Sequence, residues 1–162
     1  MTLFGEDKEL GGATFSQCGK YRYSLYRIWS SEKPLVAFIG LNPSTANEST
    51  DDRTIRRVKG FAKREDFGWF VMLNLFALVS PYPKDLELSA DPLGQNDAFL
   101  FAEAARCSAV VFCWGAFPQA RQRAKKVEEM FPGALCLGKT KEGAPRHPLY
   151  LSQTTKLEKY AV

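Results

Sequence analysis

Three continuous apolar runs, separated by segments of helical periodicity, constrain the fold of this chain more than any other feature. The runs are LVAFIGL at residues 35–41, WFVMLNLFAL at residues 69–78 and SAVVFCWG at residues 108–115. Each run is rich in β-branched and aromatic residues and is too short for a buried helix, which is typical of strands covered on both faces. A shorter run, ALCLG at residues 134–138, has the same character. We therefore expect four buried strands.

The segments between these runs predict helices. The first helix begins after Asp51 or Asp52, either of which is a suitable N-cap. A second is predicted in QNDAFLFAEAAR at residues 95–106, with Asn96 or Asp97 near its cap. Strands that alternate with helices of about a dozen residues indicate βαβ units and a mostly parallel sheet with right-handed connections. The apolar faces are predicted to be Ile55, Val58, Phe61 and Ala62 in the first helix, and Ala120, Ala124, Val127 and Phe131 in a third.

The N-terminal part of the chain follows a different pattern. TFSQCGKYRYSLYRIW at residues 14–29 alternates large and polar residues around Cys18-Gly19-Lys20, which predicts an antiparallel hairpin. Residues 1–12 are polar and contain glycine, and we expect them to be loosely ordered. A length of 162 residues favours a single domain spanning residues 1–162. The predicted fold is an α/β protein, a three-layer α/β/α sandwich with a central, mostly parallel four-stranded sheet and an N-terminal antiparallel hairpin.

Composition limits the class of protein. No apolar run approaches the roughly 20 residues needed to span a bilayer, and MTLFGEDKEL has acids where a signal peptide needs a basic head. We therefore expect a cytoplasmic protein without membrane contact. The four cysteines, Cys18, Cys107, Cys113 and Cys136, form no C-x-x-C pair, so we expect reduced, buried thiols, with no metal and no cofactor. The net charge of +4 is compatible with a phosphate backbone as partner, and equally with a soluble enzyme.

The unusual polar residues fall where the predicted parallel strands end. Asn42-Pro43-Ser44-Thr45 follows the first strand, and Asn74 lies near the end of the second. Trp114-Gly115 closes the third strand, and Arg146-His147-Pro148 follows the fourth. Ligands of open parallel sheets bind at the carboxyl ends of the strands. The sequence therefore predicts a site at this edge of the sheet and leaves its substrate open.

Each candidate has a structural and a functional interpretation. Asn42 either forms a strand-exit turn or orients a water, with Ser44 and Thr45 in an anion-binding turn. The side chain of Asn74 is either hydrogen-bonded within the core or free to bind the edge of a base. His147 is either a structural residue, as a lone histidine usually is, or a functional one beside Arg146 after a strand. It is the only histidine, so any near-neutral imidazole chemistry must use it.

The segment DDRTIRR also has two interpretations. Asp51 and Asp52 fit a helix cap and charge pairing along the first turn. Alternatively, Arg56 or Arg57 binds a phosphate or a base, oriented by one of the acids. No further ligand pattern accompanies the two acids, so nothing supports a magnesium site. Serine-hydrolase elbows, P-loops and dinucleotide-binding glycine motifs are absent from the sequence.

Five blocks of the sequence resemble known families. FIGLNPSTA, DDRTIRR, VMLNLFAL, VVFCWGA and RHPLYL, in this order over nearly the whole chain, resemble a bacterial and phage family of unknown function. More distantly, the same blocks are similar to the uracil-DNA glycosylase superfamily. GLNPS resembles its G-x-N-P-G water-binding motif, VMLN its L-L-N strand end, VVFCWGAFPQ its V-x-F-L-L-W-G-x-x-A-Q segment, and RHPLYLS its H-P-S-P-L-S loop.

The second resemblance implies a role for each matched residue. Asn42 would orient the hydrolytic water, Asn74 would hydrogen-bond the base, and His147 would stabilise negative charge on the departing base. The resemblance also implies that Gly40, Leu41 and Pro43 lie around the substrate, that Ser44, Arg146 and Ser152 contact phosphates, and that Leu149 or Tyr150 is a wedge in the duplex. From their places in the sequence, and not from the resemblance, we also expect Trp114 at the substrate and Thr45, Arg56 and Arg57 at phosphates.

The expected function is that of a DNA glycosylase-like protein that recognises an altered base and excises it by N-glycosidic hydrolysis. The motif has Asn where the most active branch has a general-base Asp, so we expect slow activation of water. One rival is a hydrolase or transferase acting on a free nucleotide, with Arg56 and Arg57 on its phosphate. Another is a non-catalytic nucleic-acid-binding module. In each case the expected partner is DNA or a nucleotide. The segment DDRTIRR, which contains Asp51 and Asp52, has no counterpart in the glycosylase superfamily, and we expect it to determine the specificity of this protein.

Overall fold

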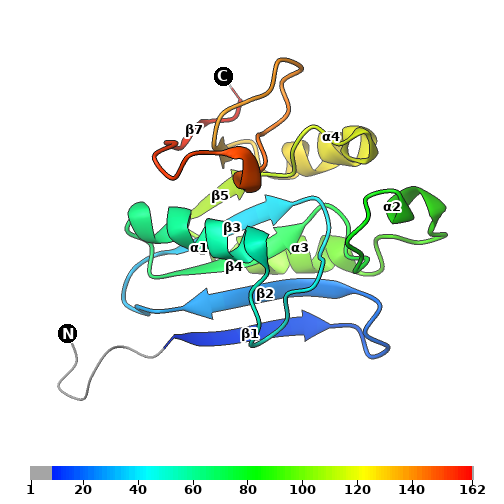
Figure 1. Ribbon diagram of the computed structural model, residues 1–162, viewed down its shortest axis with the longest axis horizontal. Coiled ribbons are helices and arrows are strands. Elements are labelled where there is room, and N and C mark those ends of the chain that lie inside the picture. The colour runs from blue at the N-terminus through cyan, green and yellow to red at the C-terminus, as the bar shows by residue number, and fades with distance from the viewer. Residues whose placement is uncertain (1–8, 162) are drawn as a thin grey trace.

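One mixed sheet of seven strands, in the order β1-β2-β4-β3-β5-β6-β7, organises the chain in the computed structural model, which describes residues 9–161 (Figure 1). The strands are β1 (Leu10–Phe15), β2 (Arg22–Ile28), β3 (Leu35–Gly40), β4 (Trp69–Asn74), β5 (Ala109–Phe112), β6 (Leu135–Cys136) and β7 (Glu158–Lys159). The α-helices are α1 (Arg53–Arg64), α2 (Asp85–Leu88), α3 (Asn96–Ala104) and α4 (Arg121–Met130), and the 3-10 helices are η1 (Pro118–Ala120) and η2 (Pro148–Tyr150).

The protein is α/β, as predicted, but the sheet is wider than predicted. β4, β3, β5 and β6 are parallel neighbours and include the four apolar runs. The prediction of a four-stranded sheet is wrong because the N-terminal hairpin joins the same sheet. β2 pairs antiparallel with β4, with Leu25 opposite Met72. At the other edge, β7 pairs antiparallel with β6.

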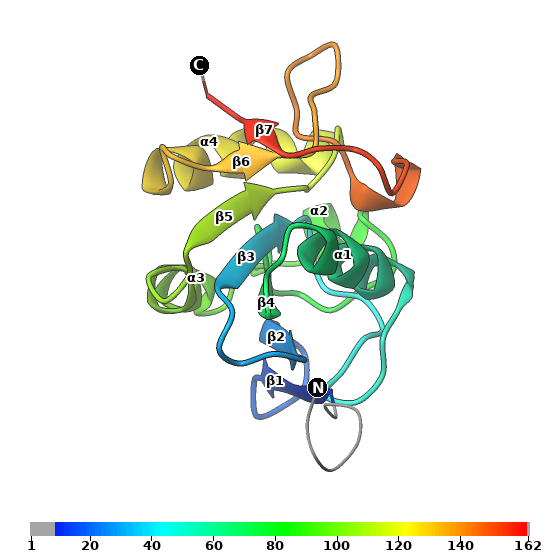
Figure 2. The ribbon, with the colours of Figure 1, turned by 90° about the vertical axis from the view of Figure 1, so that its left-hand side faces the viewer.

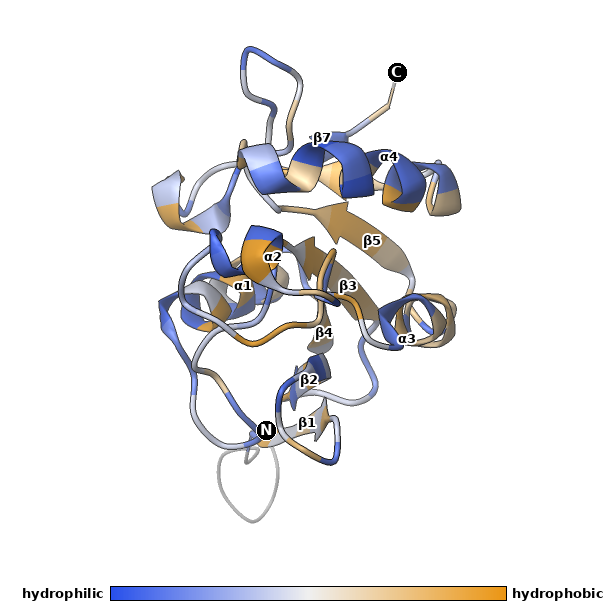
Figure 3. Ribbon diagram, turned by 90° about the vertical axis from the view of Figure 1, so that its right-hand side faces the viewer, coloured by the Kyte–Doolittle hydropathy of each residue, from blue (hydrophilic) through white to orange (hydrophobic). Residues whose placement is uncertain are grey.

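Helices cover both faces of this sheet (Figure 2). Along β3, Leu35, Ala37 and Ile39 belong to the apolar cluster beneath α3 and α4. Val36 and Phe38 belong to the cluster beneath α1. This alternation follows from the two-residue period of a strand, and burying each large apolar side chain stabilises the fold by about 1.5–3 kcal/mol. In Figure 3 the helices carry polar residues alongside apolar ones, whereas β3 and β5 are apolar.

The first predicted helix is present with its predicted face. Asp52 is the N-cap of α1, and its Oδ1 accepts a hydrogen bond of 2.9 Å from the backbone N–H of Ile55. The buried residues of α1 are the four that the periodicity predicts, Ile55, Val58, Phe61 and Ala62. α3 and α4 also form where helices are predicted. At α3, Gln95 occupies the cap position and Asn96 is the first helical residue.

The segment before the predicted hairpin is more ordered than predicted. β1 begins at Leu10, so residues 10–12 are part of a strand rather than loosely ordered. Residues 1–8 lie outside the described residues. None of the helices in residues 9–161 has the length and apolar character needed to cross a lipid bilayer.

Candidate functional site

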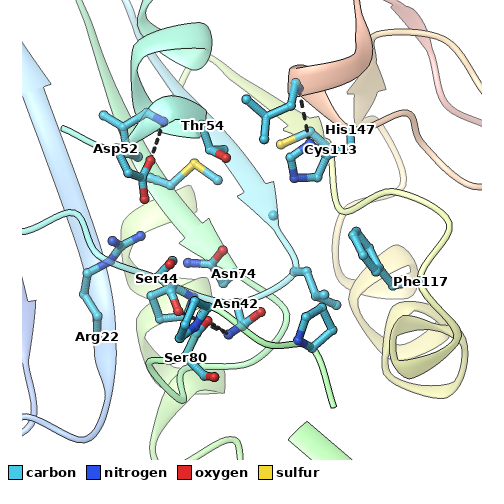
Figure 4. Close-up of a pocket in the computed structure, with 18 residues that line it drawn as sticks. Arg22, Asn42, Ser44, Asp52, Thr54, Asn74, Ser80, Cys113, Phe117 and His147 are labelled. Atoms are coloured by element: carbon cyan, nitrogen blue, oxygen red, sulfur yellow. Dashed lines mark hydrogen bonds between the residues drawn. The ribbon is translucent and has the colours of Figure 1, made fainter. Parts of the chain in front are cut away.

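A pocket of about 240 Å³ opens where the parallel strands end (Figure 4). Gly40 and Asn74 are the last residues of β3 and β4, and both line it. The other walls come from the start of β2, the segment after β3, the start of α1, the segment 80–83, the segment after β5 and the start of η2. The volume is below the roughly 300–1,000 Å³ of drug-sized ligand pockets, so the pocket suits a single small ring and its substituents. The lining is Arg22, Gly40, Leu41, Asn42, Pro43, Ser44, Asp52, Thr54, Ile55, Met72, Asn74, Ser80, Pro81, Pro83, Cys113, Phe117, His147 and Leu149.

The side chain of Asn42 is held in one orientation by backbone carbonyls. Its Nδ2 donates to the carbonyl oxygens of Pro43 at 3.1 Å, Leu78 at 3.1 Å and Ser80 at 2.9 Å. Because only the NH₂ end of an amide can donate, these contacts fix which end is nitrogen. The Oδ1 of Asn42 accepts no hydrogen bond from the described residues and is left as an oriented acceptor.

Asn74 presents an unpaired amide to the pocket. The residue is 3% exposed, and its side chain makes no hydrogen bond to any described residue, although its backbone oxygen accepts one of 2.7 Å from Asn96 Nδ2. The amide of Asn74 is thus available to a ligand that offers both a donor and an acceptor.

His147 is held as a neutral donor. Its Nδ1 accepts a hydrogen bond of 3.2 Å from the backbone N–H of Leu149, so the proton of the neutral ring is on Nε2. Burial lowers the pKa of His147 below its ordinary value, and the negative charge of Asp52 opposes this shift only in part. Gly115 lies against the histidine with a φ of +78°, and a Cβ there would come within 3.2 Å of the His147 Cβ.

Arg22 is a buried cation in the pocket wall. It is 3% exposed, and its Nη1 donates to the backbone oxygen of Ala46 at 3.1 Å. Its Nε is buried and has no hydrogen-bond partner among the described residues. Burial lowers the pKa of Arg22 to about 10, with Asp52 opposing the shift and Arg27 adding to it. The side chain therefore remains a guanidinium cation at neutral pH.

The two acids before α1 have separate roles. Asp51 binds Arg27 Nε at 2.9 Å and Lys59 Nζ at 2.6 Å, and these contacts tie the segment before α1 to β2. Burial acts to raise the pKa of Asp51, but the hydrogen bonds from Lys59 and Arg27 outweigh it and the pKa lies below its ordinary value. Asp52 instead lines the pocket, and apart from the Ile55 contact its carboxylate accepts no hydrogen bond from the described residues.

The structure brings about half of the predicted residues together. Those that line the pocket are Gly40, Leu41, Asn42, Pro43, Ser44, Asp52, Asn74, His147 and Leu149. Those that do not are Thr45, Asp51, Arg56, Arg57, Trp114, Arg146, Tyr150 and Ser152. Trp114 is 2% exposed and packs in the core, with its ring centroid 4.5 Å from that of Phe112.

The remaining predicted residues lie outside the pocket. Arg56 Nη1 donates to the backbone oxygen of Asp51, and Arg57 Nε to that of Pro148. Ser152 is exposed and hydrogen-bonded to Thr154. Tyr150 is 75% exposed, and its ring centroid lies 5.5 Å from that of His147. Arg146 and Tyr150 line a neighbouring hollow of about 320 Å³ that shares Phe117 and His147 with the pocket.

Half of the lining was not predicted. Sequence reasoning missed Arg22, Thr54, Ile55, Met72, Ser80, Pro81, Pro83, Cys113 and Phe117. A usable signal existed for Cys113 and Phe117, which flank the predicted strand end at Trp114-Gly115. Arg22 gave no such signal, because it is one of several basic residues in an alternating strand.

All four cysteines are free thiols, although not all are buried. Cys113 and Cys136 are buried, Cys107 is intermediate, and Cys18 is exposed in the turn between β1 and β2. Burial raises the pKa of the Cys113 thiol, so this pocket residue is an uncharged, apolar wall rather than a nucleophile. Within residues 9–161, no group of three His, Cys, Asp or Glu side chains is arranged to hold a metal ion.

Residues 22–149 match the sequence model of one protein family, described as a protein of unknown function (DUF1643). This range begins at Arg22 and ends at Leu149, and so contains every residue that lines the pocket. No curated protein and no solved structure matched the chain.

Proposed function

The chain belongs to the DUF1643 family of proteins of unknown function, and we propose that its pocket binds an altered base of DNA and hydrolyses the N-glycosidic bond that holds it. One observation carries this proposal. Asn42, Asn74 and His147 come from three separate segments and line one pocket, each with an unused hydrogen-bonding atom. The likeness of GLNPS, VMLN and RHPLYLS to uracil-DNA glycosylase motifs supports the same assignment, as does the parallel core of four strands.

The reaction needs stabilisation of a departing anion. The bond between C1′ of the sugar and the base nitrogen breaks, and both electrons leave with the base. The Nε2–H of His147 donates to the base as negative charge develops on it. The Asn74 amide offers one donor and one acceptor to the base edge. Donors fixed before the reaction are worth about 10²–10³ in rate, because they need not reorganise.

The reaction also needs a placed water. The oriented Oδ1 of Asn42 accepts a hydrogen bond from the water whose oxygen attacks C1′. An amide cannot accept a proton, so another group must take the proton that the water loses. Asp52 is the one carboxylate among the described lining residues, and it takes this role. It is carried on the segment DDRTIRR, which has no counterpart in the glycosylase motifs.

The surface beside the pocket fits a DNA strand. Flipping a base out of a duplex costs a few kcal/mol, which contacts around the pocket must offset. The exposed ring of Tyr150 offers a stacking surface next to His147, and Arg146 in the same hollow offers a charge to a phosphate. Leu149 lines the pocket itself, so of the two expected wedge residues Tyr150 is the better placed.

A free-nucleotide enzyme is the second candidate, and one observation favours it. The buried cation Arg22 lies in the pocket wall, where it is suited to an anionic group on a small ligand. Arg56 and Arg57, the residues first expected to hold a phosphate, lie outside the pocket. The candidates differ in substrate size, since one requires a duplex and the other a free nucleotide.

Base excision from defined duplexes tests the proposal. Duplexes carrying uracil, mismatched thymine, or oxidised or hydroxymethylated pyrimidines are incubated with the protein and cleaved with alkali. We expect abasic sites on at least one substrate, and a loss of roughly 100-fold or more in Asn42→Ala and His147→Ala. Arg106→Met is the control, because Arg106 pairs with Glu103 on the surface and contacts no part of the pocket.

Two outcomes would contradict the proposal. If no duplex yields abasic sites while free nucleotides are consumed, the second candidate is correct. If the protein binds DNA, forms no abasic sites and keeps its affinity in Asn42→Ala, it is a non-catalytic binding module.

A further inference from the structure

Arg22 reaches the pocket because of the direction of its strand. β2 runs antiparallel to β4, so the first residue of β2 lies at the carboxyl end of β4. The backbone N–H of Arg22 donates to the oxygen of Ala77, just beyond β4, at 2.9 Å. A residue from the predicted hairpin is thereby added to the site formed by the parallel strands. Figure 4 shows it on the same side of the pocket as Asp52, with Asn74 between it and His147.

A second arginine on the same strand shows what a structural role requires. Arg27 is 2% exposed, as buried as Arg22. Its Nε binds the Asp51 carboxylate at 2.9 Å, its Nη1 donates to the Tyr26 oxygen at 2.9 Å, and its Nη2 donates to the Asn47 oxygen at 2.6 Å. The charge and donors of Arg27 are therefore satisfied within the protein.

Arg22 has no comparable set of partners. Of its five N–H donors, one on Nη1 is bound to Ala46, and no described carboxylate lies within 4.0 Å of its nitrogens. Asp52, the one acid that acts on the pKa of Arg22, does not contact it and uses Oδ1 to cap α1. A buried guanidinium without a contacting counter-ion is unfavourable unless a ligand supplies one.

The unpaired amide of Asn74 is a second and independent sign of a ligand. It is 3% exposed and lines the same pocket as Arg22. An amide does not neutralise a cation, so the two side chains require different parts of one molecule. Asn74 requires a ring edge with both a donor and an acceptor, whereas Arg22 requires an oxyanion, the group that a guanidinium binds best.

We propose that the pocket takes an anionic ligand, a base or nucleotide whose carboxylate or phosphate oxygen binds Arg22 while its ring binds Asn74. The ring half of this inference rests on the proposed function, and the oxyanion half rests on Arg22 alone. The oxyanion is either a substituent of the base or the phosphate of the nucleotide that carries it.

Calorimetric titration of the purified full chain with matched ligands separates these sources. Uracil is compared with a uracil that carries a ring carboxylate, and uridine with its 5′-monophosphate. We expect either the uracil carboxylate to bind about tenfold tighter or more than uracil, or the 5′-monophosphate to do so relative to uridine. A gain of this size is what charge-assisted hydrogen bonds to Arg22 imply. Arg22→Met abolishes that preference, while Arg106→Met, which removes an equal charge on the surface, leaves it unchanged.

Arg22→Lys is measured alongside, so that the test does not depend on one variant folding. Lysine keeps the charge but not the planar fork, so we expect an intermediate preference. Thermal unfolding of each variant verifies that it is folded.

Equal affinity for charged and neutral partners in the wild type overturns the inference but leaves base binding and the proposed function in place. Binding of the anions, or of inorganic phosphate, that depends on Arg22 but not on Asn74→Ala supports the oxyanion site and rejects base recognition. Absence of any binding rejects both halves.

Discussion

Individual polar residues of the pocket are fixed by backbone groups rather than by one another. Carbonyl oxygens hold Asn42, and a backbone N–H holds the Nδ1 of His147. Asn74 is positioned by packing instead. A Cβ at Gly40 would lie 3.0 Å from Asn74 Oδ1 and 2.7 Å from Met72 Cε, so the space beside the amide exists because residue 40 is glycine.

Replacing that glycine tests the importance of the amide. Gly40→Ala should displace the Asn74 side chain. Of the uracil and uridine ligands described above, the one that binds the wild type most tightly should bind this variant roughly tenfold more weakly, the equivalent of one lost hydrogen bond. The fold should survive, because the closest atom is the flexible end of Met72. Calorimetric affinity and thermal unfolding measure the two effects. Gly133→Ala is the matched control, since a Cβ there meets no atom of residues 9–161 within 4 Å. Unchanged affinity in Gly40→Ala would remove Asn74 from the site.

At this scale the sequence was informative only where a residue type is unusual for its surroundings. An amide in an apolar strand and a lone histidine after a strand are such cases, and Asn74 and His147 do line the pocket. Trp114 also follows a strand, but its large apolar ring is most stable in the core, where it lies. Arg22 could not be predicted, because the surroundings that bury it come from distant parts of the chain.

Among the elements, α1 links the fold to the site. The segment before α1 is anchored to β2 by two arginines. Arg22 donates to the backbone oxygen of Ala46, and Arg27 donates to that of Asn47. Asp51 completes this anchor through Arg27 and Lys59. Asp52 is the N-cap of α1 and also lines the pocket, so the capping of α1 and the proposed proton acceptance depend on the same carboxylate.

Two substitutions separate the cap from the chemistry. Asp52→Ala removes both and should lower the free energy of unfolding by about 1 kcal/mol, the usual value of an N-cap. Asp52→Asn retains the capping oxygen, so its stability should stay near that of the wild type. Both should lose excision activity by a similar factor, roughly 10²-fold or more, because neither accepts a proton. Denaturant unfolding and alkali cleavage of treated duplexes measure the two properties. Full activity in Asp52→Asn would exclude Asp52 as the proton acceptor.

Elements that belong to an apolar run or a repeated pattern were predicted, including the two-residue β6 within ALCLG, whereas the short elements α2 and β7 were not. β3, β4 and β5 are continuous apolar runs, and the α1 face has four apolar residues at helical spacing. α2 has four residues and β7 has two, so each spans about one period of its pattern and neither is long enough for the pattern to repeat. The hairpin was predicted as a separate addition to the sheet. Its pairing with β4 is a long-range contact that local periodicity does not contain.

For the whole molecule, the main consequence of that pairing is the composition of the site. The carboxyl edge of the parallel strands was predictable, and it supplies the uncharged polar groups Asn42 and Asn74. The charged groups Arg22 and Asp52 come from an antiparallel strand and a helix start that reach the same edge. The pocket thus contains uncharged and charged polar groups, and the charged ones set the ligand class that we propose.

Because His147 is the only histidine and lines the pocket, the pH dependence of stability near neutral pH reports on the protonation of this pocket residue. The folded pKa of His147 lies below its ordinary value because of burial, and protonation would also cost the hydrogen bond that Nδ1 accepts from Leu149. A group with a lowered pKa in the folded state binds its proton more readily when unfolded. Its stabilising contribution is therefore complete above the unfolded pKa of about 6.5 and is lost as the pH falls through the folded pKa.

We accordingly expect the free energy of unfolding to decrease as the pH is lowered from about 7 towards 5, with a slope of at most about 1.4 kcal/mol per pH unit for one proton. Urea unfolding at a series of pH values measures it. His147→Asn keeps a side-chain acceptor for the Leu149 N–H but does not titrate, so its curve should be flatter in this window. Asp51 and Asp97, whose pKa values are lowered, titrate at more acidic pH and do not contribute there. A wild-type curve as flat as that of His147→Asn would show that the imidazole is not held neutral, and the proposed neutral donor at Nε2 would have to be abandoned.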